Sequence, residues 1–285
     1  MKIGLVDVGG GIRGIYATGV LDYCMDNNIS FDVAIGVSAG SANISSFLAH
    51  QRGRNYVFYT DYLFRKKYAS LHNFIFKKSY IDMDYVYGTL SNHDGENPLN
   101  YSAIQENPAE FYIVATEADT GAVKYFDKSD LSQDNYDPLK ASSSIPFVCK
   151  PYDINGKKYY DGALSDPIPI EKAFSCGCDK VVLILTKPES TIRTPNKDRK
   201  LAYFIRKKYP KSAEALRLRA QHYNEGVALA QKYAKQGKLL IISPDNTFGV
   251  DTLTKNKEAI KKLYEKGYQD GEKIKEFLQK QSGSK

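Results

Sequence analysis

Two glycine-rich turns, each set between a short apolar segment and a helical pattern, dominate the beginning of the sequence. Residues 2–8 (KIGLVDV) are rich in β-forming residues and end in three glycines, after which apolar residues recur at helical intervals toward Asn27. Residues 31–35 predict a second strand, which runs into the glycine-flanked segment 36–40 and then into a helix of small residues through about residue 49. Repeated strand–helix units favour a parallel sheet with helices on both faces, so we expect an α/β fold.

The rest of the chain contains further strands and helices but no linker that divides it. Residues 52–100 are rich in Tyr, Phe and Lys with weak periodicity, and we expect them to form an insertion or a cover over the end of the sheet. The patterns predict strands at 111–115, 122–126, 181–185 and 239–242, a hairpin at 152–159, helices at 131–143, 197–208, 212–236 and 256–280, and a disordered tail at 282–285. We expect a single domain over residues 1–285, with its motifs in about 2–175 and a basic helical part at about 190–281.

The composition limits the class of protein. The 285 residues, 42% of them hydrophobic, are enough to form the core of an enzyme. Asp7 and the glycines interrupt the apolar N-terminus before a signal-peptide core forms, and no segment reaches the roughly 18 apolar residues of a membrane span. The four cysteines are typical of reduced, structural thiols, so we expect a cytoplasmic protein. The net charge of +7 favours peripheral contact with an anionic membrane surface, although a solvated helix face is the simpler explanation; we expect no nucleic acid partner.

Residues 36–40 (GVSAG) have the Gly-x-Ser-x-Gly pattern of a nucleophile elbow. In such an elbow a sharp turn from strand to helix lifts the serine hydroxyl out of the sheet, and the flanking glycines avoid collision with the neighbouring backbone. A serine at a helix N-terminus also has free backbone N–H groups and the positive end of the helix dipole beside it, where an oxyanion would form. Ser38 is therefore the candidate nucleophile.

Residues 9–14 (GGGIRG) follow the first strand and open the first helix, so their backbone amides can converge on an anion. The same string satisfies Gly-x-Gly-x-x-Gly, the fingerprint of dinucleotide-binding folds, which expects an acidic residue at the end of the second strand. That end is occupied by residues 36–38, and Asp32 lies at the opposite end. An oxyanion hole beside Ser38 accounts for both glycine motifs, because adjacent parallel strands would bring the two turns to one edge of the sheet.

A serine nucleophile needs a general base, and the histidines are poor candidates for that role. They are His50, His72, His93 and His222, which lie at a helix end, in the irregular region or among polar helix neighbours. His222 is the histidine to test, since an ordinary α/β-hydrolase triad runs Ser, Asp, His along the chain. Asp161, between two tyrosines and Gly162, is the better candidate, although a turn aspartate that accepts backbone hydrogen bonds is the alternative.

Three motifs in order, GGGIRG at 9–14, GVSAG at 36–40 and DGA at 161–163, resemble the signature motifs of patatin-like phospholipases. Residues 141–146 (ASSSIP) resemble the stretch that leads to the catalytic aspartate of that family, and the resemblance covers roughly residues 2–175. It implies a three-layer α/β/α sandwich around a mainly parallel sheet. It also implies lipid acyl hydrolase activity through a Ser–Asp dyad without histidine, chemistry that requires no cofactor and no metal ion.

Carried over residue by residue, the resemblance implies Ser38 as nucleophile and Asp161 as general base, with an acyl-enzyme intermediate. The oxyanion donors would be the amides of Gly10, Gly11 and Ala39, supported by the motif residues Gly9, Arg13, Gly14, Gly36, Gly40 and Gly162. One departure is Val8, which stands where many members carry an acidic residue; the acid here is Asp7, one place earlier. An aspartate with its ordinary pKa of about 3.9 is a weak base, so this mechanism needs burial to raise it.

Three points stay open at this stage. A catalytically silent lipid- or protein-binding module on the same fold is the alternative to an enzyme. Arg13 lies in the first turn of a helix, where a cation opposes the dipole, so we expect a definite partner, either a structural salt bridge or an anionic head group. The Tyr- and Phe-rich stretch at 56–87 suits an acyl pocket or lid as well as ordinary packing.

Overall fold

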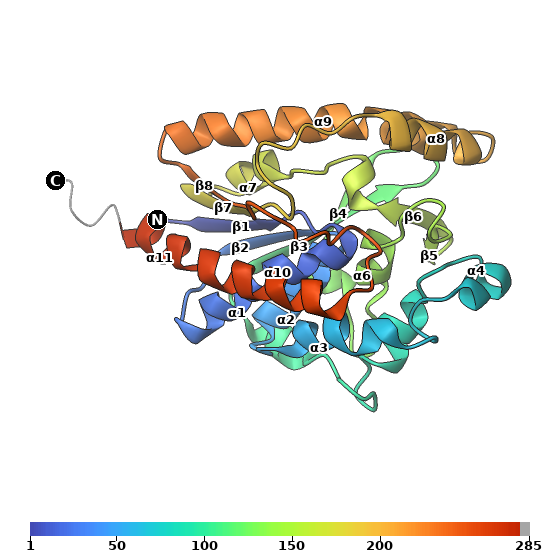
Figure 1. Ribbon diagram of the computed structural model, residues 1–285, viewed down its shortest axis with the longest axis horizontal. Helices are drawn as coiled ribbons and strands as arrows, with labels where there is room; N and C mark the ends of the chain where they lie inside the picture. The colour runs from blue at the N-terminus through green and yellow to red at the C-terminus, as the bar shows by residue number, and fades with distance from the viewer. Residues whose placement is uncertain (280–285) are drawn as a thin grey trace.

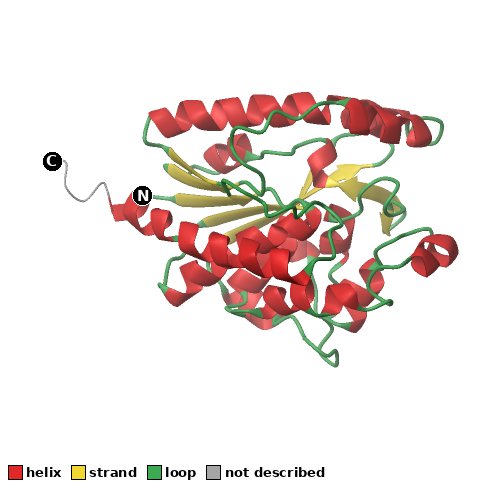
Figure 2. Cartoon of the chain, viewed as in Figure 1, coloured by secondary structure: helices red, strands yellow, loops and turns green. Residues whose placement is uncertain are grey.

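The computed structural model describes residues 1–279 as a mixed α/β fold around one eight-stranded sheet, in which helices lie on both sides (Figures 1 and 2). The strand order is β5-β6-β3-β2-β1-β7-β8, with β4 paired to β3. The strands are β1 (Ile3–Asp7), β2 (Val33–Val37), β3 (Glu110–Glu117), β4 (Val123–Phe126), β5 (Tyr152–Ile154), β6 (Lys157–Asp161), β7 (Lys180–Ile184) and β8 (Leu239–Ile242). Strands β3, β2, β1, β7 and β8 are parallel, β4 and β6 pair antiparallel with β3, and β5 pairs antiparallel with β6.

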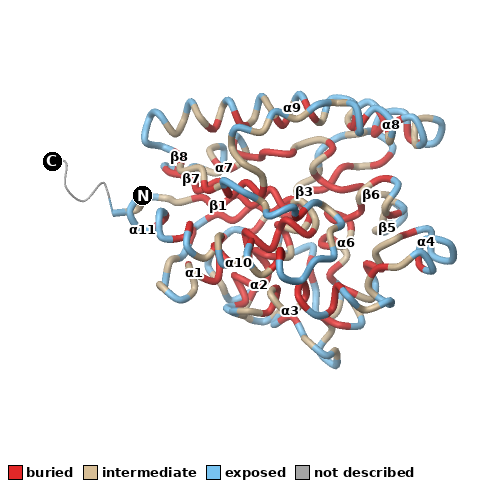
Figure 3. The backbone as a smooth tube through the Cα atoms, viewed as in Figure 1, coloured by how far each residue is buried: buried red, intermediate tan, exposed pale blue. Residues whose placement is uncertain are grey.

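Helices cover both faces of this sheet, which confirms the expected α/β/α sandwich. One face carries α1 (Ile15–Asp26), α2 (Ala39–Leu48) and α10 (Lys257–Asp270), and the other carries α7 (Ile170–Ser175) and α9 (Pro210–Lys235) (Figure 1). Alternate residues of β1 belong to two different cores: Leu5 packs with α1 and α10, and Val6 packs with α7 and α9. Because both faces are buried, the central strands are mostly apolar, and their polar residues lie near the strand ends (Figure 3).

Residues 52–100, expected to form an insertion or a cover over the end of the sheet, form a series of short helices, the first of which packs against α1, α2 and α10. They contain α3 (Arg54–Thr60), a 3-10 turn (Tyr62–Phe64), α4 (Leu71–Lys77) and a π-helical turn (Tyr85–Thr89), and they are followed by α5 (Tyr101–Glu106). The remaining helices are α6 (Asp137–Ser142), α8 (Asn196–Ile205) and α11 (Glu272–Gln279). No helix within residues 1–279 is long and apolar enough to cross a membrane.

The prediction of a helix over 131–143 was wrong for its first half. The helix begins only at Asp137, because Pro138 occupies the first helical turn, where its missing N–H costs nothing. The second strand lies two residues later than its predicted range of 31–35, and Asp32 sits before it, accepting a hydrogen bond from the Ile3 amide at 2.6 Å.

The predicted helix over 256–280 is divided within the described residues. It breaks at Gly271, which packs against the side chain of Tyr23, so that α10 and α11 are separate helices. The predicted disordered tail at 282–285 lies outside the described residues.

Candidate active site

The turn between β2 and α2 has the geometry of a nucleophile elbow. Ser38 has φ 57° and ψ −130°, a backbone conformation that residues other than glycine rarely adopt. A Cβ atom on Gly36 would lie 2.6 Å from the amide nitrogen of Ser41, and one on Gly40 would lie 2.8 Å from Cγ of Asp7. The two flanking glycines therefore allow a turn that any side chain would block. Ser38 is only 5% exposed.

The glycine loop after β1 lies against this elbow. Strands β1 and β2 are parallel with Asp7 opposite Gly36, so both turns leave the sheet at the same edge. A Cβ atom on Gly9 would overlap the carbonyl oxygen of Val37 and lie 3.0 Å from the amide nitrogen of Ala39. Within residues 1–279, the amides of Gly10, Gly11 and Ala39 have no acceptor. The structure thus brings the three expected oxyanion donors to the neighbourhood of Ser38 with their N–H groups unused.

The carboxylate of Asp7 holds the glycine loop after β1 in place. This carboxylate accepts hydrogen bonds from the Gly9 amide at 2.9 Å and from Nδ2 of Asn43 at 3.0 Å, and Nδ2 of Asn43 also donates to the Gly14 carbonyl at 3.0 Å. Complete burial raises the pKa of Asp7 to about 6, although these two hydrogen bonds act in the opposite direction. Asp7 therefore anchors the loop even though Val8 is not acidic.

Asp161 reaches the elbow from the antiparallel side of the sheet. It ends β6 opposite Ala115 of β3, and a Cβ atom on the following Gly162 would lie 2.6 Å from the carbonyl carbon of Val114. Its Oδ1 accepts a hydrogen bond from the Ala163 amide at 2.8 Å. Asp161 is 2% exposed.

Burial raises the pKa of Asp161 above its ordinary value. The nearby Ser38 side chain, the Ala163 amide and the positive charges of Arg219 and Arg193 oppose this rise. The structure therefore brings Ser38 and Asp161 together in a desolvated environment. Such an environment makes a carboxylate a stronger base.

Ser142 is a site residue that the sequence reasoning missed. Its Oγ accepts a hydrogen bond from the Ser38 amide at 2.9 Å and donates one to the Val114 carbonyl at 2.6 Å. Two residues later, the Ser144 carbonyl accepts from the Asp161 amide at 2.9 Å. The segment 141–146, known from the sequence only as a stretch preceding Asp161, therefore holds the backbones of both Ser38 and Asp161.

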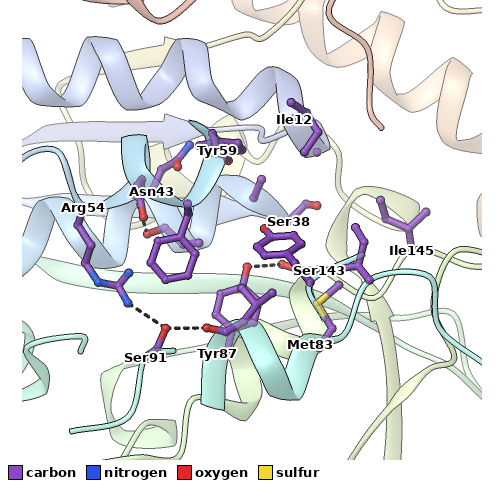
Figure 4. Close-up of a pocket in the computed structure, with 18 residues that line it drawn as sticks. Ile12, Ser38, Asn43, Arg54, Tyr59, Met83, Tyr87, Ser91, Ser143 and Ile145 are labelled. Carbon is purple, nitrogen blue, oxygen red and sulfur yellow. Dashed lines mark hydrogen bonds between the residues drawn. The ribbon is translucent and has the colours of Figure 1, made fainter. Parts of the chain in front are cut away.

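A narrow cavity of about 70 Å³ opens beside Ser38 (Figure 4). Gly11, Ser38 and Ala39 line one part of it. Seven of the other fifteen lining residues are aromatic or apolar side chains of the segment predicted as an acyl pocket or lid: Phe58, Tyr59, Tyr68, Ile81, Met83, Val86 and Tyr87. A hydrogen bond of 3.1 Å between the hydroxyls of Tyr87 and Ser143 closes one side. The cavity is therefore a mostly apolar space that reaches the candidate nucleophile.

The other candidates from the sequence lie elsewhere or have a structural role. None of the four histidines, all within the described residues, lines the cavity. Arg13 has the definite partner that we expected, because it pairs with Asp251 and donates to Oγ1 of Thr252 at 3.2 Å. Among residues 1–279 no three His, Cys, Asp or Glu side chains are grouped as metal ligands.

Comparison with known proteins gives matches along most of the chain. The family described as "Patatin-like phospholipase" matches residues 6–174, and a domain of unknown function, DUF6363, matches residues 209–281. The "Uncharacterized protein YjjU" of Escherichia coli strain K12 is 31% identical over 196 residues, which are 68% of this chain and 54% of that protein. This chain thus spans about half the length of that relative. The crystal structure of VipD from Legionella pneumophila aligns with 96% of this chain and 66% of its own, at 12% identity and a TM-score of 0.49.

Proposed function

Because this chain belongs to the patatin-like phospholipase family, we propose that it is a serine acyl hydrolase that cleaves lipid esters through a Ser38–Asp161 dyad. The observation that carries the proposal is the arrangement at the end of β2. The strained Ser38 and Gly11 of the glycine loop line one mostly apolar cavity, and the buried Asp161, whose pKa is raised, lies close to Ser38.

The mechanism follows from these positions. Asp161 takes the proton of the Ser38 hydroxyl, and Ser38 Oγ attacks the ester carbonyl carbon. The amides of Gly10, Gly11 and Ala39 donate hydrogen bonds to the oxyanion of the tetrahedral intermediate. The intermediate collapses to an acyl-enzyme as the alcohol leaves with the proton from Asp161. Water, deprotonated by the same carboxylate, then releases the fatty acid.

The ester hydrolase function is tested with p-nitrophenyl butyrate, whose short acyl chain suits a narrow cavity. We expect the wild-type protein to hydrolyse this ester with a burst of nitrophenolate of about one per chain, which reports acyl-enzyme formation. The Ser38→Ala variant should show neither the burst nor turnover above background. Wild-type-like turnover in that variant would contradict the assignment of Ser38.

An exposed apolar surface supports peripheral contact of the protein with a membrane. The apolar surface consists of residues of α4, of the loop after α6 and of α8: Leu71, Phe74, Ile75, Phe76, Phe147, Tyr203 and Phe204. Phe147 links the two helices, since its ring centroid lies 6.1 Å from that of Phe74 and 5.3 Å from that of Phe204. α4 and α8 lie at the same end of the molecule (Figure 1). Exposed lysines without a carboxylate within 4 Å in residues 1–279 flank them at positions 66, 67, 78, 207 and 208. A surface of exposed aromatic side chains flanked by lysines favours binding to an anionic lipid surface.

Removing two of these side chains should weaken membrane contact without harming the dyad. We expect the Ile75→Ser/Phe76→Ser variant to bind vesicles of 30% anionic lipid at least about a hundredfold less tightly in sedimentation, because burying each of the two side chains is worth roughly 1.5–3 kcal/mol. The control is Val123→Ser, an exposed apolar residue of β4 outside the apolar surface. Equal vesicle binding by the double variant and the wild type would contradict this role.

A further inference from the structure

Beside the glycine loop lies a group of cations that the dyad mechanism does not use. Arg13 is 8% exposed, and in addition to its contacts with Asp251 and Thr252 it has a buried Nε atom without a hydrogen-bond partner among residues 1–279. Its terminal nitrogen Nη2 lies 3.2 Å from the position that a Cβ atom on Gly10 would take. The guanidinium group therefore lies directly against the candidate oxyanion loop.

Two further cations come to this place from the segment between β7 and α8. Thr186 hydrogen-bonds to the Gly9 carbonyl, which puts the next residue, Lys187, beside the glycine loop. The backbone of Arg193 is held by Asn224 of α9, which accepts from its N–H at 2.9 Å and donates to its carbonyl at 3.0 Å. The Arg193 guanidinium lies 5.0 Å from the ring centroid of Tyr223. Both side chains are partly exposed and so remain accessible from solvent.

The positive charges of Arg13, Lys187 and Arg193 are close enough to repel one another. Burial and the positive charges of Arg13 and Arg193 lower the pKa of Lys187 to about 8, and burial and the charge of Arg219 lower the pKa of Arg193 to about 10. The same Arg219 and Arg193 charges act on Asp161. Arg193 of the cationic group therefore lies near enough to Asp161 for its charge to act on the carboxylate.

The carboxylates nearby do not balance this charge. Asp251 pairs with Arg13, and Asp198 pairs with Arg219. Within residues 1–279, neither Lys187 nor Arg193 has a carboxylate oxygen within 4 Å. Partly buried cations without a counter-ion are costly, and an anion that binds between them recovers part of that cost.

We propose that Arg13, Lys187 and Arg193 form a binding site for the phosphate group of the acyl ester substrate, and that this phosphate site selects anionic over zwitterionic phospholipids. The inference rests on the proposed acyl hydrolase function. Guanidinium groups donate paired hydrogen bonds to phosphate oxygens, and an ammonium adds a point charge, so the three residues suit a group with several anionic oxygens. A zwitterionic head group carries its own cation, which the excess positive charge of the site repels.

The first test of the phosphate site measures ligand binding, which does not depend on turnover. The thermal stability of the Ser38→Ala protein is measured with dihexanoyl phosphatidic acid, dihexanoyl phosphatidylcholine and inorganic phosphate at equal concentrations below micelle formation. We expect phosphatidic acid to raise the melting temperature, and the Arg193→Gln and Lys187→Gln substitutions to reduce that rise. The control is Arg217→Gln, which removes an exposed cation of α9 outside the cationic group and should keep the full rise. An equal rise in melting temperature with inorganic phosphate would show a site for free anions and overturn the substrate phosphate site. No rise with phosphatidic acid would also overturn the proposal.

The second measurement is the ratio of kcat/KM for the two lipids. We expect the ratio of phosphatidic acid to phosphatidylcholine hydrolysis to fall about tenfold in Arg193→Gln and in Lys187→Gln, and to stay at the wild-type value in Arg217→Gln. Hydrolysis of both lipids with a ratio that neither substitution changes would overturn the phosphate site while leaving the hydrolase intact. Binding that depends on Arg193, together with no hydrolysis of any ester, would instead overturn the proposed function and leave the site.

Discussion

Replacing Asp161 by Asn should lower kcat by about 10³-fold while the protein stays folded, because the amide cannot take the Ser38 proton. The Asn side chain keeps an oxygen that accepts the Ala163 amide, so the turn after β6 should survive. Burial raises the pKa of Asp161, which means that its ionisation at neutral pH opposes folding. The melting temperature of the variant at pH 7 should therefore equal or exceed that of the wild type. Activity on p-nitrophenyl butyrate and circular dichroism of the same samples measure both effects.

The matched control is Asp166→Asn. Asp166 lies five residues later, burial also raises its pKa, and it bonds to the Tyr125 hydroxyl instead of facing Ser38. We expect that variant to keep most of its activity. The pH profile provides a second check: since the base must be deprotonated, wild-type kcat/KM should fall as the pH falls through the raised pKa of Asp161. Full activity of Asp161→Asn would remove Asp161 from the mechanism.

Replacing Gly9 by Ala should have the second largest effect, because it displaces the loop that carries the oxyanion donors. Gly9 has φ 62°, and its new Cβ would overlap the Val37 carbonyl oxygen and lie 2.8 Å from the Gly40 amide nitrogen. We expect activity to fall by about 10²–10³-fold, the effect of losing an oxyanion donor. Overpacking and strain together should lower the free energy of unfolding by about 2–4 kcal/mol.

The Gly53→Ala variant separates backbone strain from overpacking. Gly53 has a similar φ of 75°, but nothing lies within 4 Å of the position that its Cβ would take. This control should therefore show only the cost of a left-handed alanine, about 1 kcal/mol, and normal turnover. If Gly9→Ala kept normal turnover at a temperature where it is folded, the glycine loop would not supply the oxyanion hole.

The sequence predicted those parts of the fold that depend on local patterns. The two strand–glycine–helix units at 2–27 and 31–49 were predicted because the apolar strands, the glycine turns and the helical periodicity agree with one another. The parallel pairing of β1 with β2, which brings residues 9–14 beside Ser38, follows from the general geometry of such units. The start of α6 was missed because the Leu131–Ser143 pattern is helical in character, although Pro138 fixes where the helix begins.

The site was predictable only as far as its residues carry recognisable motifs. Ser38 and Asp161 stand in such motifs, but Ser142 acts through one hydroxyl whose partners, Ser38 and Val114, are distant in the sequence. The proposed phosphate site brings together residue 13 from the turn after β1 and residues 187 and 193 from the segment between β7 and α8, and these residues form no motif. Their juxtaposition depends on tertiary packing of α9 and of the loops after β1 and β7.

The most direct test of the central claim is labelling with a fluorophosphonate, which reacts only with an activated serine. We expect one label per wild-type chain, located on Ser38 by mass spectrometry of the peptides, and no label on Ser38→Ala. Ser45→Ala, which changes another buried serine of α2, should label as the wild type does. An unlabelled but well-folded wild type, or a label that persists in Ser38→Ala, would contradict the account of this chain as a Ser38-dependent acyl hydrolase.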